Sequence, residues 1–336
     1  DAAQAAVDLT RVNVAASTAR AYADACTAGF RLDVMQHSID LQMQSAQISE
    51  RLQQADVSYG HGTTNAFDEA AWLVLWQLGL PLDSDIDDPA LPTPTAAQQQ
   101  AVAALVEQRI SSRKPAAYLT GEAWLQGVPF YVDERAIIPR SLIAEVLADG
   151  SIDAFLPAST SRVLDLCTGN GSLAVLAALA WPDVQVDAAD ISDDALAVAR
   201  INIDKHGLQQ RITLLHSNGL QQCATGYDLI LCNPPYVNAG SMAQLPPEYL
   251  AEPELALAGG ADGMDFIRTM LASAAQHLAP QGVLVLEIGN EADYFAAAFP
   301  ALQPIWLSTS AGDEQVLLLD YASLQAHANA AKEQQP

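Results

Sequence analysis

The sequence predicts an α/β fold in which a mostly parallel sheet with helices on both faces follows a small helical domain and a linking β-hairpin. Three observations support this prediction. Helical periodicity prevails up to about residue 112, short stretches broken by glycine and proline fill residues 123–140, and strands alternate with helices from Arg162 onward. The chain has 336 residues, half of them hydrophobic, which is enough for a catalytic domain with its own core and a smaller accessory domain.

The N-terminal part of the chain is predicted to be helical. Residues 1–54 are rich in Ala and Gln, carry few charges and contain no chemical motif, so we expect a helical extension without an assigned role. In residues 55–122, apolar side chains recur at helical spacing from Asn65 to Leu80 and again from Thr95 to Ser112. This segment is therefore expected to form a small helical domain.

The hairpin linker at residues 123–140 leads into an α/β domain at residues 141–322. Its pattern predicts strands and crossover helices in alternation, which is typical of a parallel sheet. The expected strands are Arg162–Cys167, Val184–Asp190, Arg211–His216, Tyr227–Cys232 and Gly282–Ile288, and the expected helices are Ser172–Ala180, Ser192–His206 and Gly263–Leu278.

The end of the chain departs from this alternation. Two further strands, around Ile305 and at Gln315–Tyr321, are too close in sequence for a crossover helix and are therefore expected to pair in antiparallel fashion. Residues 323–336 are expected to be a frayed helical tail.

Apolar runs and cysteine spacing limit the class of protein. The longest uncharged apolar runs, Ala70–Leu82 and Ser172–Pro182, are shorter than the roughly 18 to 20 residues that span a bilayer, so we expect a soluble protein. The four cysteines have neither disulfide-like nor metal-type spacing, which favours a reducing cytoplasm and predicts no metal site.

The net charge bears on the partner. A formal charge of −25 argues against a nucleic-acid backbone as the main partner, because such binding depends on Lys and Arg that displace counterions. The acidic charge favours a basic protein as the partner. The alternative is that the acidic surface only keeps the protein soluble and does not bind a partner.

A glycine-rich loop, Asp165–Ser172, lies where a buried strand ends and a helix begins, which is where an open α/β sheet binds its ligand. Its glycines allow a tight turn and close approach of the backbone, and the helix start offers free N–H groups. Asp190 ends the next strand, nineteen positions after Gly171, where it can accept hydrogen bonds from both ribose hydroxyls. Together these features predict a nucleoside-containing cofactor; a plain strand-to-helix turn is the alternative.

The same loop also fits the dinucleotide fingerprint, as Gly169, Gly171 and Ala174 have the required spacing. A nicotinamide-dependent oxidoreductase therefore remains open at this point. Nothing after the second strand offers an acid or base for hydride transfer, which disfavours it.

The sequence Asn233-Pro234-Pro235-Tyr236 follows the strand that ends at Cys232, at the edge of the sheet that also carries the glycine-rich loop. An amide NH₂ has two donors and a poorly nucleophilic nitrogen. The Asn233 side-chain oxygen and the Pro234 carbonyl can each accept one of its protons, because two prolines fix the backbone. Such positioning favours in-line methyl transfer to the nitrogen, and Tyr236 can stack on the substrate amide. A simple turn is the alternative for this motif.

Here the sequence resembles the HemK-like glutamine methyltransferases, which act on translation proteins, and the resemblance extends from about Tyr59 to Tyr321. It implies a Rossmann-like class I methyltransferase fold, S-adenosylmethionine as cofactor, and a helical substrate-recognition role for residues 55–122. Within the family, the segments that resemble the branch modifying large-subunit ribosomal protein L-three are Gly60–Asn65, Ala117–Trp124, Ile138–Ser141 and Glu252–Leu257. The release-factor branch usually reads Pro-Arg-Pro-Glu-Thr-Glu where this chain has Pro139–Ala144.

The resemblance also implies roles for single residues. The catalytic and substrate-binding motif would be Asn233, Pro234, Pro235 and Tyr236, with Glu252 at the substrate mouth. Cofactor contacts would come from Asp165, Cys167, Thr168, Gly169, Asn170, Gly171 and Ser172 at the methionine end, Asp190 at the ribose, Asn218 and Gly219 at the adenine edge, and Asn233. Asn218 stands where the family usually has Asp, and Asn170 where Ser is common.

Several alternatives stay open. His61 is a catalytic base or, more in keeping with the mechanism, a helix-entry or substrate contact. Glu252 and Glu254 line the substrate mouth or form a solvated loop, and Arg140 holds the cofactor carboxylate or anchors the hairpin. A release-factor methyltransferase is the nearest alternative function. A nucleic-acid adenine methyltransferase can use the same Asn-Pro-Pro-Tyr motif, but the acidic charge argues against it.

Overall fold

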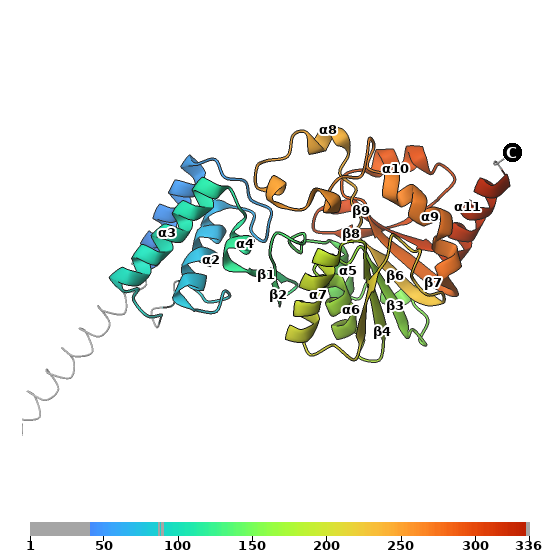
Figure 1. The fold of residues 1–336 in the computed structure, drawn as a ribbon, viewed down its shortest axis with the longest axis horizontal. Coiled ribbons are helices and arrows are strands. Elements are labelled where there is room, and N and C mark those ends of the chain that lie inside the picture. Colours follow the sequence, from blue (N-terminus) through green and yellow to red (C-terminus); the bar gives the residue numbers. More distant parts are fainter. Residues whose placement is uncertain (1–40, 87, 89–90, 334–336) are drawn as a thin grey trace, which may run out of the picture. The chain divides into compact units, whose positions relative to one another are not determined.

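The computed structural model describes residues 41–86, 88 and 91–333, which form two compact units (Figure 1). One unit contains the described residues of Asp1–Val57 and Asn65–Ser111, and the other contains Ser58–Thr64 and the described residues from Ser112 onward. Residues 41–54 are helical, whereas the first forty residues of the expected extension lie outside the described part of the chain. Among the described residues, no helix has the length and apolar character needed to cross a membrane.

The first unit is a helical bundle. It contains the helix at residues 41–54, α2 (Ala66–Leu78) and α3 (Ala96–Ser112). Asn65 caps α2, because its side-chain oxygen accepts hydrogen bonds from two backbone N–H groups of the first turn. Gly79 then ends the helix in the left-handed conformation. Both predicted helices are confirmed, with ends that differ by one or two residues.

The second unit begins with short elements. Helix α4 (Ala116–Thr120) precedes an antiparallel hairpin of β1 (Glu122–Leu125) and β2 (Val128–Tyr131), which confirms the predicted hairpin. Residues 132–140 continue as a loop without strand pairing, and α5 (Ile143–Ala148) follows. The hairpin is tied to the sheet domain, because the side chain of Asn202 bonds both the N–H and the carbonyl of Tyr131.

The described residues form a seven-stranded sheet with the order β5-β4-β3-β6-β7-β9-β8. The first five strands in this order are parallel, and β9 runs antiparallel to both of its neighbours. This arrangement confirms the predicted mostly parallel sheet with an antiparallel C-terminal strand. The strands are β3 (Arg162–Leu166), β4 (Gln185–Asp190), β5 (Ile212–His216), β6 (Tyr227–Cys232), β7 (Leu278–Glu287), β8 (Ile305–Thr309) and β9 (Gly312–Asp320).

Helices cover both faces of the sheet, as alternate side chains of each strand enter different cores. Val163 and Leu229 belong to the core that includes α6 (Ser172–Ala180), whereas Leu164 and Ile230 belong to the core that includes α9 (Asp265–His277). Figure 1 also shows α7 (Asp193–Lys205), α10 (Ala292–Ala298) and α11 (Tyr321–Glu333) around the sheet.

The expectation of a frayed tail after residue 323 is wrong for the described part of that segment. Helix α11 starts at Tyr321, and its Leu324 is fully buried in the same core as Ile267 and Leu271 of α9. Its apolar positions therefore hold the helix against the sheet domain. The segment is polar on average, so its composition does not indicate a packed helix. A single row of buried apolar side chains is nevertheless enough to hold a helix against a domain.

The long connection from β6 to α9 has little regular structure. It contains α8 (Ala239–Met242) and the short 3₁₀ turns η2 (Tyr249–Ala251) and η3 (Glu254–Ala256). A single parallel bridge between Val237 and Ala258 closes it into a loop beside the end of β6. This loop supplies one wall of the cavity described next.

Candidate active site

A cavity of about 720 Å³ opens at the carboxyl ends of β3, β4, β6 and β7, the edge where open α/β sheets bind ligands. It combines most of the residues that the sequence predicted for the site. The predicted residues that line it are Cys167, Thr168, Gly169, Asn170, Ser172, Asp190, Asn218, Gly219, Asn233, Pro234, Pro235 and Tyr236. Asp165, Gly171 and Glu252 are not among the lining residues.

The loop after β3 turns sharply on three residues in the left-handed conformation. Cys167, Gly169 and Gly171 have φ angles of 61°, 54° and 81°. A Cβ on Gly171 would lie 3.0 Å from the Cβ and 3.2 Å from the Cα of Ala199, so glycine is required for the loop to pack against α7. Gly171 therefore acts behind the cavity, by shaping the loop that lines it.

Asp165 also supports this loop from behind. It is fully buried, and its Oδ2 accepts hydrogen bonds from the Thr168 hydroxyl and the Ala174 N–H. Burial raises the pKa of Asp165 to about 7 despite these two hydrogen bonds. Its other oxygen, Oδ1, has no hydrogen-bond partner among the described residues. The carboxyl group thus fixes the loop and keeps one oxygen unused.

Asp190 lies at the end of β4, on the neighbouring strand. Its Oδ2 accepts from the Gly169 N–H and its Oδ1 from the Ser192 N–H, both at 2.9 Å. Burial raises the pKa of Asp190, while the backbone hydrogen bonds act in the opposite direction. The Ile191 N–H also interacts with this carboxylate. A carboxylate has about four acceptor positions, so Asp190 keeps room to accept from a hydroxyl group of a ligand.

Asn218 and Gly219 follow β5 on the same side of the cavity. The N–H of Asn218 donates to Gln222, and its side chain is exposed. Two apolar residues that the sequence did not single out, Ile191 and Phe266, line the cavity in this region. Their presence suits a flat aromatic ring, but only the position of Ile191, directly after Asp190, gave a signal in the sequence.

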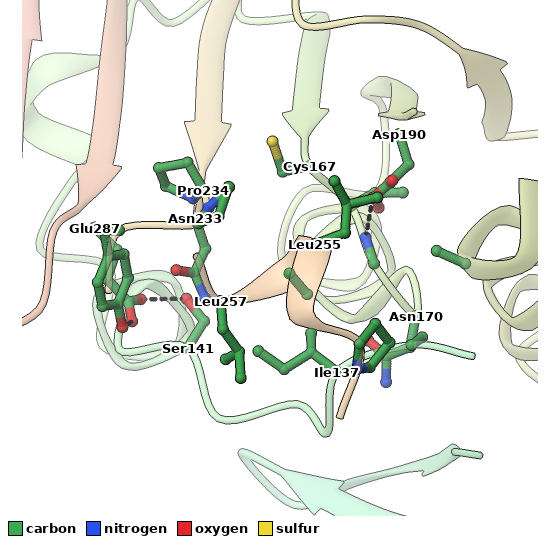
Figure 2. Close-up of a pocket in the computed structure, with 18 of the residues that line it drawn as sticks. Ile137, Ser141, Cys167, Asn170, Asp190, Asn233, Pro234, Leu255, Leu257 and Glu287 are labelled. Atoms are coloured by element: carbon green, nitrogen blue, oxygen red, sulfur yellow. Dashed lines mark hydrogen bonds between the residues drawn. The ribbon is translucent and has the colours of Figure 1, made fainter. Parts of the chain in front are cut away.

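The Asn-Pro-Pro-Tyr motif leaves β6 on the opposite side. Figure 2 shows Asn233 and Pro234 on one side of the cavity and Asp190 on the other, with Cys167 between them. The Tyr236 hydroxyl donates to Glu287 Oε1 at 3.1 Å. Burial, and after it the charge of Glu287, raises the pKa of Tyr236 well above its ordinary value, so the phenol stays protonated and acts as a donor.

Glu287 is a cavity residue that sequence reasoning missed. It ends β7, is 3% exposed, and uses Oε2 to accept from the Ser141 hydroxyl at 2.6 Å and the Leu142 N–H at 2.9 Å. Burial raises the pKa of Glu287, and its hydrogen bonds from Ser141 and Tyr236 oppose that rise. Its position at a strand end next to β6 was the available signal.

Arg140 and Glu252 form an ion pair at the cavity edge. Arg140 lines the cavity and donates to both carboxylate oxygens of Glu252, which also accepts from the Ile138 N–H. His61 Nε2 lies 3.5 Å from Glu252 Oε2. Glu252, predicted to contact the substrate, thus faces Arg140 from outside the cavity. Of the two roles considered for Arg140, these contacts match the anchoring of the segment after the hairpin.

Comparison with known proteins adds the family. A model of the methyltransferase small domain matches residues 151–252. The ribosomal protein uL3 glutamine methyltransferase of Bordetella pertussis is 54% identical over 274 residues, which cover 80% of this chain and 91% of that protein. Proteins of the same name from Burkholderia pseudomallei and Bradyrhizobium diazoefficiens are 53% and 44% identical, over 82% of this chain and 92% and 88% of their own length. The chain belongs to the ribosomal protein uL3 glutamine methyltransferase family.

Membership of this family makes the protein an enzyme, a methyltransferase, and does not favour the oxidoreductase, adenine methyltransferase or release-factor alternatives. Solved structures are less similar: a ribosomal protein L11 methylase from Lactobacillus delbrueckii is 22% identical, covering 51% of this chain and 75% of its own, with a TM-score of 0.37. Within residues 41–86, 88 and 91–333, no three His, Cys, Asp or Glu side chains are grouped so that they could hold a metal ion.

Proposed function

We propose that this methyltransferase transfers the methyl group of S-adenosylmethionine to the side-chain amide nitrogen of a glutamine in ribosomal protein uL3. The observation that carries the proposal is that Asn233–Tyr236 line the same cavity as the glycine-rich loop and Asp190. One site therefore combines a nucleoside-binding wall with two acceptors suited to an amide NH₂. The names of relatives that are 44% to 54% identical support uL3 as the substrate.

The residues of the cavity fit the proposed cofactor. Asp190 would accept hydrogen bonds from the ribose, and the apolar side chains of Ile191 and Phe266 would enclose the adenine. Asn170 lines the cavity, and its buried Nδ2 has no hydrogen-bond partner among the described residues, which leaves a donor for the methionine carboxylate. When bound, the cofactor supplies a methyl group on a positively charged sulfur. Asn218, which is exposed on the adenine side, would contribute less to cofactor binding than these residues.

The second half of the site would hold the substrate amide. The Asn233 side-chain oxygen and the Pro234 carbonyl would each accept one N–H of the glutamine, so that the nitrogen faces the methyl group. Pro234 and Pro235 restrict the backbone of this segment, so little entropy is lost when the amide binds. Burial of Pro234 also excludes water from this wall.

We further propose that the helices of residues 55–122 recognise the substrate and that residues 141–322 carry out the chemistry. A basic ribosomal protein suits a chain with a formal charge of −25. Because free ribosomal proteins are available before and during ribosome assembly, the proposed place of action is the cytoplasm.

The test is methyl transfer from labelled S-adenosylmethionine to isolated uL3, with a peptide-chain release factor as the competing acceptor. We expect label on one glutamine of uL3, located by mass spectrometry, and a rate of labelling about 10² to 10³ lower when the Asn233→Ala variant replaces the enzyme. Preferential labelling of the release factor would leave the chemistry in place and contradict the proposed partner. Absence of label on both proteins would contradict the proposed function.

A further inference from the structure

Tyr236, the last residue of the Asn-Pro-Pro-Tyr motif, is enclosed by three glycines. A Cβ on Gly259 would lie 2.7 Å from its Cα, and a Cβ on Gly263 would collide with its carbonyl oxygen. A Cβ on Gly289 would lie 2.5 Å from Cε2 of its ring. Glycine at these three positions therefore lets the surrounding backbone close on Tyr236 from both its main chain and its ring.

The hydroxyl of Tyr236 is held by Glu287, which is itself held on its other side. Glu287 Oε1 accepts from Tyr236, and Oε2 accepts from the Ser141 hydroxyl and the Leu142 N–H. Figure 2 shows Ser141 and Glu287 facing each other at the cavity wall. Ser141 is in turn fixed at the start of α5, where its oxygen accepts from the Ile143 N–H. With Oε2 committed to two donors, the orientation of Oε1 toward Tyr236 is set.

The strand register places Glu287 beside the start of the motif as well. Cys232 of β6 pairs with Leu286 of β7. Asn233 and Glu287 are the next residues along the two parallel strands, so they lie at the same level of the sheet edge. The motif therefore begins beside Glu287 at the end of β6, and its last residue, Tyr236, contacts Glu287 through its hydroxyl.

We propose that Glu287 is a positioning residue for methyl transfer: held by Ser141 and Leu142, it fixes the Tyr236 hydroxyl and thereby the segment whose Asn233 and Pro234 acceptors orient the substrate amide. This inference rests on the function proposed above. The physical reason is that transfer requires aligned reacting atoms, and a displacement of about 1 Å costs on the order of 100-fold in rate. Glu287 acts through Tyr236 and does not itself contact the reacting atoms.

The first test is a double-mutant cycle with uL3 as acceptor. Tyr236→Phe removes only the hydroxyl. Glu287→Met keeps the length of the side chain but removes both carboxylate oxygens, so the Tyr236 hydroxyl loses its acceptor. Glu287→Gln is unsuitable, because its NH₂ group would donate to the phenolic oxygen and restore the hydrogen bond in the opposite direction. We expect each variant to lose about 10-fold in kcat, and the double variant to lose about the same rather than 100-fold, because both changes break one contact.

A matched control separates positioning from folding. Glu291 is also a buried glutamate with a side-chain partner, accepting from Asn238 Nδ2 at 2.8 Å, and it does not line the cavity. Glu291→Met, the same substitution, should keep kcat within about twofold of the parent, as expected for a site that is not coupled to the reaction. All variants are assayed well below their melting temperatures and should retain their affinity for S-adenosylhomocysteine. Unchanged kcat in Glu287→Met and Tyr236→Phe, or multiplicative losses in the double variant, would overturn the inference.

A second test does not depend on the identity of the substrate. A crystal structure of the Glu287→Leu variant with S-adenosylhomocysteine should show the Tyr236 ring displaced or in several positions. If that variant does not fold, the same comparison is made with Glu287→Met. A Tyr236 ring in its original single position would refute the positioning role, even if uL3 proved not to be methylated. Failure of the wild-type enzyme to label uL3 would instead refute the proposed function.

Discussion

Arg140 and Glu252 face each other as a doubly hydrogen-bonded ion pair, with Nη1–Oε1 and Nη2–Oε2 distances of 2.6 and 2.7 Å. The pair joins the segment that enters α5 to the turn between η2 and η3. Bidentate geometry and the added hydrogen bond from the Ile138 N–H satisfy a carboxylate that is only 5% exposed. Loss of either partner would leave the other charge buried.

This pair predicts an acid-sensitive contribution to stability. Burial alone would raise the pKa of Glu252, but the charge of Arg140, the hydrogen bonds that Arg140 donates and the nearby His61 ring lower it from 4.5 to about 2. Because the pKa is depressed in the folded protein, the stabilisation is complete above about pH 4.5 and is lost as the pH falls toward 2. At about 1.4 kcal/mol for each tenfold change in proton affinity, it amounts to on the order of 3 kcal/mol.

Melting temperatures of the wild type and Glu252→Gln between pH 7 and pH 2 check this prediction. The difference between the two proteins should be large and constant above pH 5 and should shrink toward pH 2. Glu254→Gln is the control, since Glu254 is exposed and lies two residues away. A difference that is the same at pH 7 and pH 2 would contradict the role of the ionised carboxylate.

Replacement of Asp190 by Ala should weaken cofactor binding. Removing one partner of a buried hydrogen bond costs about 1 to 3 kcal/mol, which is roughly 5- to 150-fold in the dissociation constant. Titration calorimetry with S-adenosylhomocysteine measures it, with the exposed Asp194 on the next helix as the control substitution. Equal affinity in wild type and Asp190→Ala, or tight binding of NAD, would show that this strand end does not hold the proposed nucleoside.

The Asn233→Ala variant should separate binding from chemistry. Because Asn233 would contact the substrate amide, the variant should keep most of its cofactor affinity while turnover falls by about 10² to 10³, the cost of deleting one oriented hydrogen-bonding group at a reacting centre. Asn238→Ala is a matched control in the same segment, since Asn238 caps α8 and does not line the cavity. Turnover of the variant at the wild-type rate would show that Asn233 only forms a turn and does not contribute to the reaction.

The sequence predicted the parts of the site that local pattern encodes. The glycine-rich loop, Asp190 and Asn233 each follow a recognisable strand, and the carboxyl ends of parallel strands share one edge, so the cavity that joins them was foreseeable. The hairpin and the antiparallel β9 were foreseeable too, because connection length determines which pairings are possible.

Contacts between distant segments were not foreseeable. Arg140 and Glu252 are 112 positions apart, and Ser141 and Glu287 are 146 apart. The local sequence around each of these residues does not indicate which distant residue it contacts. A charged side chain can be identified as buried only when the surrounding structure is known. The sequence therefore predicts Glu252 at the substrate mouth but does not indicate its ion pair with Arg140. Helix α11 shows the same limit, as its burial depends on a surface that only the folded sheet provides.

The approach of the substrate to the enzyme should depend on salt. If an enzyme with a formal charge of −25 acts on a basic ribosomal protein, long-range attraction should accelerate their encounter at low salt. Exposed charges are screened beyond about 8 to 10 Å at physiological ionic strength, so kcat/KM for uL3 should fall as salt rises from low to physiological levels. The rate at saturating uL3 should change much less, because the steps after binding take place inside the cavity. A short, uncharged glutamine peptide provides the comparison, since its kcat/KM should respond little to salt. Equal salt dependence for uL3 and the peptide would show that the acidic surface serves solubility and does not steer the substrate.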